Sequence, residues 1–287
     1  MPDPLRAGAA FAVAAAAAFA VTAACVKAAS ATVGTEMVVF FRNAVSLAVL
    51  LPWLLRRGGP GLRTRRLGGH LWRAALGLCS MYCFFYAIAH LHLAESLLLT
   101  YSTPLYIPFI AWLWLREPPP AVIFPALVLG TLGIVLIARP GAAGFAPLAS
   151  AAGALSGLLS AGAMVTIRRI SDTEPATRIV FYFSALATTI SAVPLLWAWR
   201  SPDARELALL AACGASATVG QLCLTRAYAL APAARIGAIT YVSVVFAGAL
   251  GWWLWSERPD ASSLAGMALV LACCLLALWR RPAAGGA

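Results

Sequence analysis

Residues 94–119 read AESLLLTYSTPLYIPFIAWLWLREPP, and residues 234–259, which lie 140 positions later, read ARIGAITYVSVVFAGALGWWLWSERP. At this offset the two stretches share an alanine, a Thr-Tyr pair, a tryptophan, a glutamate and a proline. The same spacing relates earlier residues, among them Cys83 and Cys223, and Ala87 and Ala227. Scattered alanine matches could arise by chance, but the other identities keep one spacing over a helix pair. They predict an internal repeat in which residues 71–140 correspond to residues 211–280.

The composition places this repeat in a membrane. Of the 287 residues, 62% are hydrophobic and 11% are charged, and the mean hydropathy is +0.86. A soluble protein of this composition would have too little polar surface to cover its core. Apolar stretches of about 20 residues match a hydrocarbon layer about 30 Å thick. We predict ten such spans, at 8–29, 37–55, 71–90, 93–115, 120–138, 148–167, 178–199, 207–230, 234–255 and 261–279.

Five spans in each copy is an odd number, so the second copy must enter the membrane from the opposite side. The sequence therefore predicts an all-α integral membrane protein whose ten transmembrane helices form two five-helix inverted repeats around a central cavity. The first repeat covers residues 1–141 and the second covers residues 148–281. The first span could pass for a signal peptide, but the repeat needs it as the partner of 148–167.

Basic residues predict the orientation. If the predicted loops alternate between the two sides, fourteen lysines and arginines lie on one side and five on the other. The first group includes Arg73 and the arginine run 63–66, both assigned to the loop before the third span. By the positive-inside rule, both termini are cytoplasmic, and we expect a multi-pass protein of the bacterial inner (plasma) membrane. The run 63–66 is typical of an anchor to anionic lipid headgroups, so we expect no nucleic-acid partner.

The acidic residues exclude several functions. All ten lie at span ends or in loops, and none is near the midplane, where a carboxylate would by default mark a proton relay or cation site. No clustered acid, base and nucleophile is present, so we do not expect an enzyme. The seven cysteines lie within spans without a histidine or carboxylate to complete a metal shell. No metal and no cofactor is expected.

A polar stripe in the eighth span gives the first candidate site. Gly214, Thr218, Gln221, Thr225 and Tyr228 recur at helical spacing and share one face. Gln221 is about fourteen residues into the span and therefore close to mid-depth. The stripe either lines a cavity or hydrogen-bonds a neighbouring helix, as such residues often do in membranes.

Tyrosines give the second candidate site. Tyr82 and Tyr86 share a face of the third span, and Tyr82 is too deep for an interfacial belt. Tyr101 and Tyr241 are each about seven residues into spans that enter from opposite sides, which places them roughly 5 Å either side of the midplane. The alternative is that these rings only pack in the core. The predicted substrate-binding residues are Tyr82, Tyr86, Thr100, Tyr101, Thr103, Gln221, Thr225, Tyr228, Thr240 and Tyr241.

Arg42 and Arg226 are the charges predicted to lie well inside a span. Either side chain could snorkel to the nearer interface. If one turns inward instead, it becomes a partner for a substrate carboxylate.

Three stretches resemble a known family. Phe41-Arg42-Asn43 resembles the arginine-containing second helix of the EamA family, within the drug/metabolite transporter superfamily. Residues 94–117, with Pro104 and a terminal glutamate, are similar to its fourth helix, and residues 234–257 to its ninth. The resemblance covers nearly the whole chain. It implies ten helices, cytoplasmic termini, and a cavity surrounded by helices one, three, four, six, eight and nine.

The family includes bacterial exporters of amino acids, aromatic ones among them, and of related metabolites. We therefore expect an alternating-access exporter of small metabolites, most simply amino acids including aromatic ones, that contacts membrane lipids and acts as a monomer or homodimer. A sugar-nucleotide or organophosphate exchanger is the first alternative, and inward-facing Arg42 and Arg226 would favour it. A non-transporting membrane protein is the second.

Overall fold

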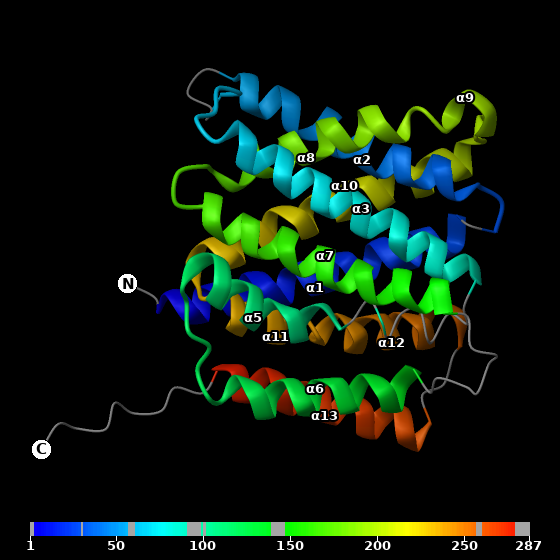
Figure 1. Ribbon diagram of the computed structural model, residues 1–287. Coiled ribbons are helices and arrows are strands. Elements are labelled where there is room, and N and C mark those ends of the chain that lie inside the picture. Colours follow the sequence, from blue (N-terminus) through cyan, green and yellow to red (C-terminus); the bar gives the residue numbers. More distant parts are fainter. Residues whose placement is uncertain are drawn as a thin grey trace, which may run out of the picture.

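The computed structural model describes residues 3–29, 31–56, 61–90, 99, 102–138, 147–256 and 260–278. Most of these residues are helical, and none of them lies in a strand. The helices run side by side in one bundle (Figure 1). The predicted all-α class is confirmed.

The first part of the chain forms α1 (Pro4–Ala29), α2 (Thr35–Leu55), α3 (Leu67–His90), α5 (Thr103–Leu115) and α6 (Ile123–Ala138). The second part forms α7 (Pro147–Ile170), α8 (Ala176–Ser191), α9 (Leu195–Ala198), α10 (Ala204–Leu230), α11 (Ala233–Ile239), α12 (Val242–Trp255) and α13 (Ala261–Leu278). Within the described ranges, α1, α2, α7 and α10 are long and apolar enough to cross a membrane. Helices α5, α6, α12 and α13 contain shorter apolar stretches.

Two spans predicted as continuous are broken. The span 178–199 forms α8 and α9, and the turn between them contains Pro194. The span 234–255 forms α11 and α12, with the break at Thr240 and Tyr241. The Thr240 hydroxyl donates to the carbonyl of Gly237 at 2.7 Å, and such local side-chain bonds compete with the regular helical pattern.

Helices from the two halves of the chain pack in pairs. Helix α1 lies along α10, α3 along α7, α2 along α8, and α6 along α13. Small residues allow close approach: a Cβ at Gly153 of α7 would lie 2.7 Å from a methyl carbon of Leu99. The largest buried cluster is drawn from both halves and includes Ala12 of α1, Ile107 of α5 and Tyr228 of α10.

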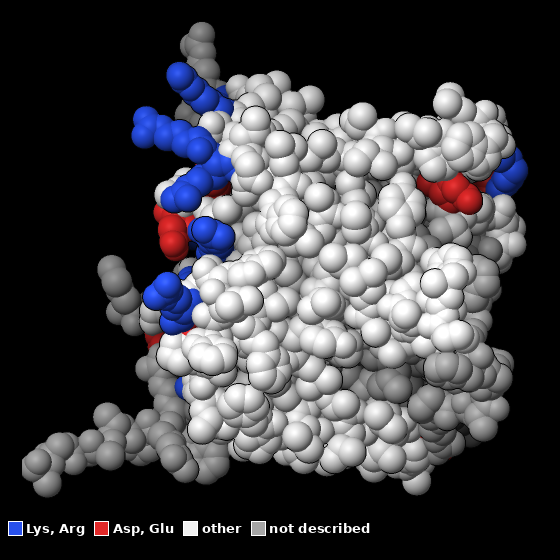
Figure 2. All heavy atoms as spheres, in the orientation of Figure 1, with Lys and Arg blue, Asp and Glu red and all other residues white. Residues whose placement is uncertain are grey.

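Charge is concentrated at the ends of the bundle. Figure 2 shows lysines and arginines gathered at one end, a broad uncharged band, and a small mixed cluster at the other end. The arginine-rich end is the one at which α1 begins and α13 ends (Figure 1). Every described acidic residue lies in the first turn of a helix or in a connection, as Glu36 and Glu117 do. The middle of the bundle therefore has the surface of a membrane-embedded protein.

Candidate functional site

The most unusual residue inside the bundle is Arg73, in the second turn of α3. It is 2% exposed. Its Nη2 donates to Oε1 of Gln221 on α10 at 3.0 Å, and its Cζ lies 3.7 Å from the ring centroid of Phe183 on α8. Its Nε and Nη1 are buried and have no hydrogen-bond partner among the residues that the structure describes. Arg73 thus joins three helices through one amide oxygen and one aromatic face.

The structure corrects the assignment of Arg73 to a loop. Because α3 begins at Leu67, Arg73 lies about 9 Å along the helix axis from its start. Within the described part of the chain, no acidic side chain forms an ion pair with it. A buried charge that lacks an opposite charge is strongly destabilising. The chemistry of this position is therefore suited to an anionic partner.

Arg42 of α2 adds a second positive charge to the same region. It is half-buried, and its helix packs on α10, which carries Gln221. An inward orientation of the Arg42 side chain stays a prediction. Arg226 of α10 is exposed, as expected for a snorkelling arginine.

The polar stripe on α10 divides into two parts with different contacts. At one end, Gly214 packs against the side chain of Val45 on α2. The Thr218 hydroxyl lies 2.6 Å from that of Ser46 on α2 and donates to its own helix at the Gly214 carbonyl. These two residues serve helix packing, the alternative to cavity lining.

The other part of the stripe comprises Gln221, Thr225 and Tyr228, all buried. Gln221 binds Arg73, and within the described part of the chain the hydroxyl of Thr225 has no hydrogen-bond partner. A buried hydroxyl without a partner is costly in a membrane, as in any apolar interior. At this end of the stripe the Thr225 hydroxyl is therefore available for a hydrogen bond to a ligand. At the packing end the Thr218 hydroxyl is already bonded.

The remaining candidates lie in varied surroundings. Tyr241 is 1% exposed, its ring packs against Gly130 of α6, and its hydroxyl is 3.3 Å from that of Thr131. These are the contacts of a core aromatic. Tyr82 and Tyr86 are 43% and 39% exposed on α3. The substrate contacts of all these tyrosines stay predictions.

Three threonines complete the predicted set. Thr240 donates to the backbone at the break between α11 and α12, and Thr103 is half-buried in the first turn of α5. Thr100 lies outside the described residues, as does Tyr101. Of the predicted residues, the structure brings Gln221, Thr225 and Tyr228 together on one buried face.

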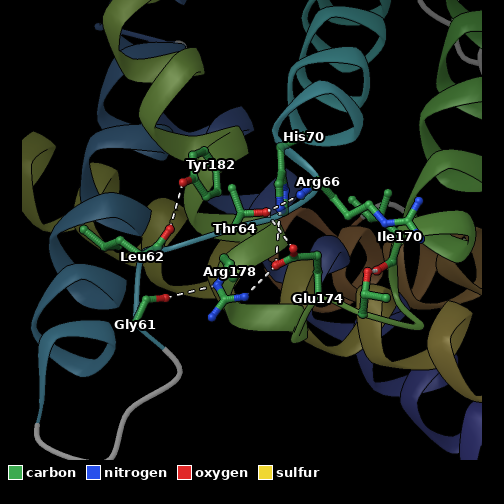
Figure 3. A network of polar contacts seen from close by, with 10 residues as sticks. Gly61, Leu62, Thr64, Arg66, His70, Ile170, Glu174, Arg178 and Tyr182 are labelled. Carbon is green, nitrogen blue, oxygen red and sulfur yellow. Dashed lines mark hydrogen bonds and ion pairs between the residues drawn. The ribbon is translucent and has the colours of Figure 1, made fainter.

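A polar network at the arginine-rich end ties the start of α3 to the connection between α7 and α8 (Figure 3). Glu174 accepts hydrogen bonds from Thr64 at 2.6 Å and from Arg178 at 2.7 Å. Nε2 of the buried His70 is 3.6 Å from the same carboxylate. Burial raises the pKa of Glu174, but the hydrogen bonds from Thr64 and Arg178 outweigh it and leave the pKa below its ordinary value. The carboxylate is therefore ionised at neutral pH.

The same network also holds the connection before α3. The His70 ring stacks on Tyr182 of α8 with centroids 4.5 Å apart, and the Tyr182 hydroxyl donates to the carbonyl of Leu62 at 2.8 Å. Arg178 donates to the carbonyl of Gly61 at 3.1 Å. Figure 3 shows these residues converging from α3, from α8 and from the connection before α3. The network therefore fixes where α3 starts and, with it, the depth of Arg73.

A second ionic contact joins four helix ends. Nε of Arg168, near the end of α7, donates to Glu117 after α5 at 3.0 Å. Nη1 of Arg168 also donates to the carbonyls of Tyr228 and Ala229 on α10. Glu117 in turn accepts from the backbone N–H of Ala233 at the start of α11. The sequence marked Glu117 only as a repeated residue, and its partner became visible from the fold alone.

Comparison with known proteins identifies the family of this chain. The model of the EamA-like transporter family matches residues 6–139 and again residues 148–279. The chain belongs to this family. The resemblance carried by Phe41-Arg42-Asn43 and by the repeated stretches is thereby confirmed.

Individual relatives transport different compounds. The pseudopaline exporter CntI of Pseudomonas aeruginosa is 36% identical over 275 residues, which are 95% of this chain and 96% of the relative. The S-adenosylmethionine uptake transporter of Rickettsia conorii is 26% identical over 82% of this chain and 79% of its own length. The riboflavin transporter of Brucella anthropi is 26% identical over 82% of this chain and 84% of its own length. The chain is thus a multi-pass membrane transporter, in agreement with the prediction that it is not an enzyme.

One solved crystal structure superposes on the bundle with a TM-score of 0.82 at 19% sequence identity. The match covers 94% of this chain and 96% of the other. At this identity the match shows a shared fold and carries no information on the substrate.

Proposed function

We propose that the chain is an alternating-access exporter of small metabolites that carry a carboxylate, with amino acids, aromatic ones included, as the simplest class. The observation that carries the proposal is the buried Arg73, which among the described residues donates a hydrogen bond to Gln221 and has two guanidinium nitrogens without a partner. A guanidinium offers a planar fork of donors that matches a carboxylate. Gln221, Thr225 and Tyr228 would supply neutral polar and aromatic contacts to the rest of the substrate.

The proposed architecture is two five-helix inverted repeats with ten crossings. Three observations support it. The family model matches the chain twice. Helices α5 and α12 are followed by the C-cap residues Arg116 and Ser256, which lie 140 positions apart and both have a left-handed backbone with φ near 57°. Helix α1 packs on α10 while α3 packs on α7, as an exchange of the two halves requires.

The proposed orientation has both termini in the cytoplasm of a bacterial cell. The end at which α1 begins and α13 ends is the end where lysines and arginines gather (Figures 1 and 2). The positive-inside rule assigns that end to the cytoplasm. In this orientation Arg73 lies in the cytoplasmic half of the membrane, where an export substrate would first meet it.

A second candidate function is the exchange of sugar nucleotides or organophosphates. The charges of Arg42 and Arg73 favour an anion without distinguishing a carboxylate from a phosphate. The pseudopaline exporter CntI supports the export of a metabolite, and pseudopaline is therefore one of the compounds to test.

Transport into inverted membrane vesicles decides between these functions. Uptake of radiolabelled phenylalanine would be measured in competition with other amino acids, their methyl esters, pseudopaline and a sugar nucleotide. We expect the free acids to compete and the esters, which lack the carboxylate, to compete at least tenfold more weakly. Equal competition by acid and ester would contradict a carboxylate site, and competition by the sugar nucleotide alone would establish the second function.

A further inference from the structure

A pocket of about 450 Å³ lies at the arginine-rich end of the bundle, between the start of α3 and the ends of α5 and α7. Its size falls within the range of ordinary ligand sites. Its walls include Arg66, Gly68 and Trp72 from the α3 side, Trp114 from α5 and Arg169 from α7. The pocket is separate from the Arg73 region, because Arg73 does not line it.

The polar side of this pocket is positively charged. Arg66 and Arg169 are both exposed, and among the residues that the structure describes neither takes part in an ion pair. Gly68 lies in the first turn of α3, where the helix dipole places partial positive charge. Two free guanidinium groups at one pocket favour a phosphate, which they can bind through charge-assisted hydrogen bonds.

Exposed apolar residues border the other side of the pocket. Trp72 is 53% exposed, and its neighbour Leu71 is 45% exposed on the same helix. Leu113, next to Trp114 on α5, is 76% exposed. Exposed leucines on a membrane-embedded bundle contact acyl chains, and tryptophans gather at the headgroup level. The pocket therefore lies where the arginine layer meets the apolar band.

We propose that this pocket binds the phosphate of an anionic phospholipid, with Arg66 and Arg169 as the charged ligands. Trp72 and Trp114 would lie beside the glycerol, and the acyl chains would follow the exposed faces of α3 and α5. A free phosphate ester carries the same charge but has no acyl chains to contact the apolar wall. The apolar wall thus favours a lipid over a soluble anion.

Gly68 provides a way to test the pocket without changing its charge. A Cβ built at Gly68 meets no heavy atom within 4 Å, so a larger side chain is tolerated at this lining position. Gly68→Leu would therefore obstruct the pocket in part while both arginines stay. A diffuse attraction between the arginines and the membrane would not be affected by this change.

The experiment uses the full-length protein in detergent, titrated with phosphatidylglycerol and followed by native mass spectrometry. Arg66→Gln with Arg169→Gln should weaken lipid binding roughly 25-fold, at about fivefold for each arginine near a membrane surface. The matched control is Arg63→Gln with Arg65→Gln, which removes two positive charges from the connection before α3, outside the pocket. Gly68→Leu should weaken binding at least tenfold, and phosphatidylethanolamine should bind the parent more weakly than phosphatidylglycerol.

Three results would overturn the proposal. Equal losses in the two double variants would show that only total charge matters. Undiminished binding by Gly68→Leu would show that the pocket is not the site. Displacement of the lipid by glycerol phosphate at equal concentration would assign the pocket to a soluble anion. If the Arg66→Gln, Arg169→Gln double variant fails to fold, lipid binding by Gly68→Leu still tests the proposal.

Discussion

Helices α3 and α10 stand 140 positions apart in the sequence, and their polar residues differ at almost every corresponding place. Arg73 on α3 corresponds to Cys213 on α10, and Gln221 on α10 corresponds to Met81 on α3. Arg73 and Gln221 nevertheless meet in one hydrogen bond. In the proposed repeat, two unrepeated polar residues thus lie against each other. We expect the substrate-selective residues of this bundle to lie where the two copies differ.

The two helices also begin in different ways. Helix α10 starts with a local capping box, in which Asp203 and Glu206 bond each other's backbone N–H at 2.8 and 2.9 Å. Helix α3 has no acidic residue in its first turn. Its start is held instead by contacts from His70 to Glu174 and Tyr182, more than 100 positions away. One helix start is fixed by sequence neighbours, and the other depends on the tertiary fold.

The largest expected effect comes from removing the charge of α3. Arg73→Met should lower transport of a carboxylate substrate by roughly 10- to 150-fold, because a hydrogen bond to a charged group is worth about 1.5–3 kcal/mol. The same change should leave the thermal stability in detergent equal or higher, because it replaces a buried, unpaired charge by an apolar side chain. Transport assays and melting curves on the same preparation measure both.

Arg226→Gln is the control for Arg73→Met, because it removes one positive charge from the exposed face of α10. It should leave transport nearly unchanged. If Arg73→Met melts lower than the parent and transports normally, Arg73 is a structural residue, and α3 does not differ from α10 in the way proposed.

The sequence predicted the features of the fold that depend on local composition. Apolar runs of about 20 residues identify helices through hydropathy alone, and α1, α2, α7 and α10 follow the predicted spans closely. The break at Thr240 and Tyr241 was not predictable in this way. Both residues are compatible with a helix, and the break involves a side-chain bond to Gly237.

The candidate site was predicted in part. Periodicity identified the stripe on α10, but it could not separate Thr218, which packs on Ser46, from Gln221, which binds Arg73. Arg73 was missed because it is close in sequence to the loop arginines. Position 73 already lay inside the predicted span 71–90, and the apolar residues on both sides of it, Leu71-Trp72 and Ala74-Ala75-Leu76, were the signal that Arg73 belongs to the helix. The Glu117–Arg168 pair joins residues 51 positions apart, and only the packing of α5 on α7 shows it.

The second-largest expected effect tests whether the start of α3 depends on tertiary contacts while the start of α10 depends on a local cap. Glu174→Gln should lower the free energy of unfolding by about 1.5–3 kcal/mol at pH 7, because it weakens charge-assisted bonds from Arg178 and Thr64. Asp203→Ala removes the local cap of α10 and should cost about 1 kcal/mol. Thermal or chemical unfolding in detergent compares the two.

The pH dependence of the free energy of unfolding identifies the contribution of the Glu174 carboxylate. Because the pKa of Glu174 is lowered in the folded protein, its stabilisation is complete above the unfolded pKa of about 4.3 and is lost as pH falls through the folded value. The difference between the parent and Glu174→Gln should therefore shrink in acid. A difference that stays constant from pH 7 to below pH 4 would show that the carboxylate is not the stabilising group.

The smallest effect concerns the amide that α10 contributes to the shared contact. Gln221→Ala leaves Arg73 buried without an oxygen partner and removes one neutral amide, whose hydrogen bonds are worth about 0.5–1.5 kcal/mol each. Substrate affinity should fall about two- to tenfold for each bond lost. Met81→Ala, at the corresponding place on α3, should instead lower stability and leave affinity unchanged, because Met81 packs on an apolar cluster. Half-saturation constants in vesicles and melting temperatures in detergent separate the two outcomes. If both variants change stability and neither changes affinity, then the difference between α3 and α10 serves packing alone, and the substrate is held by other helices.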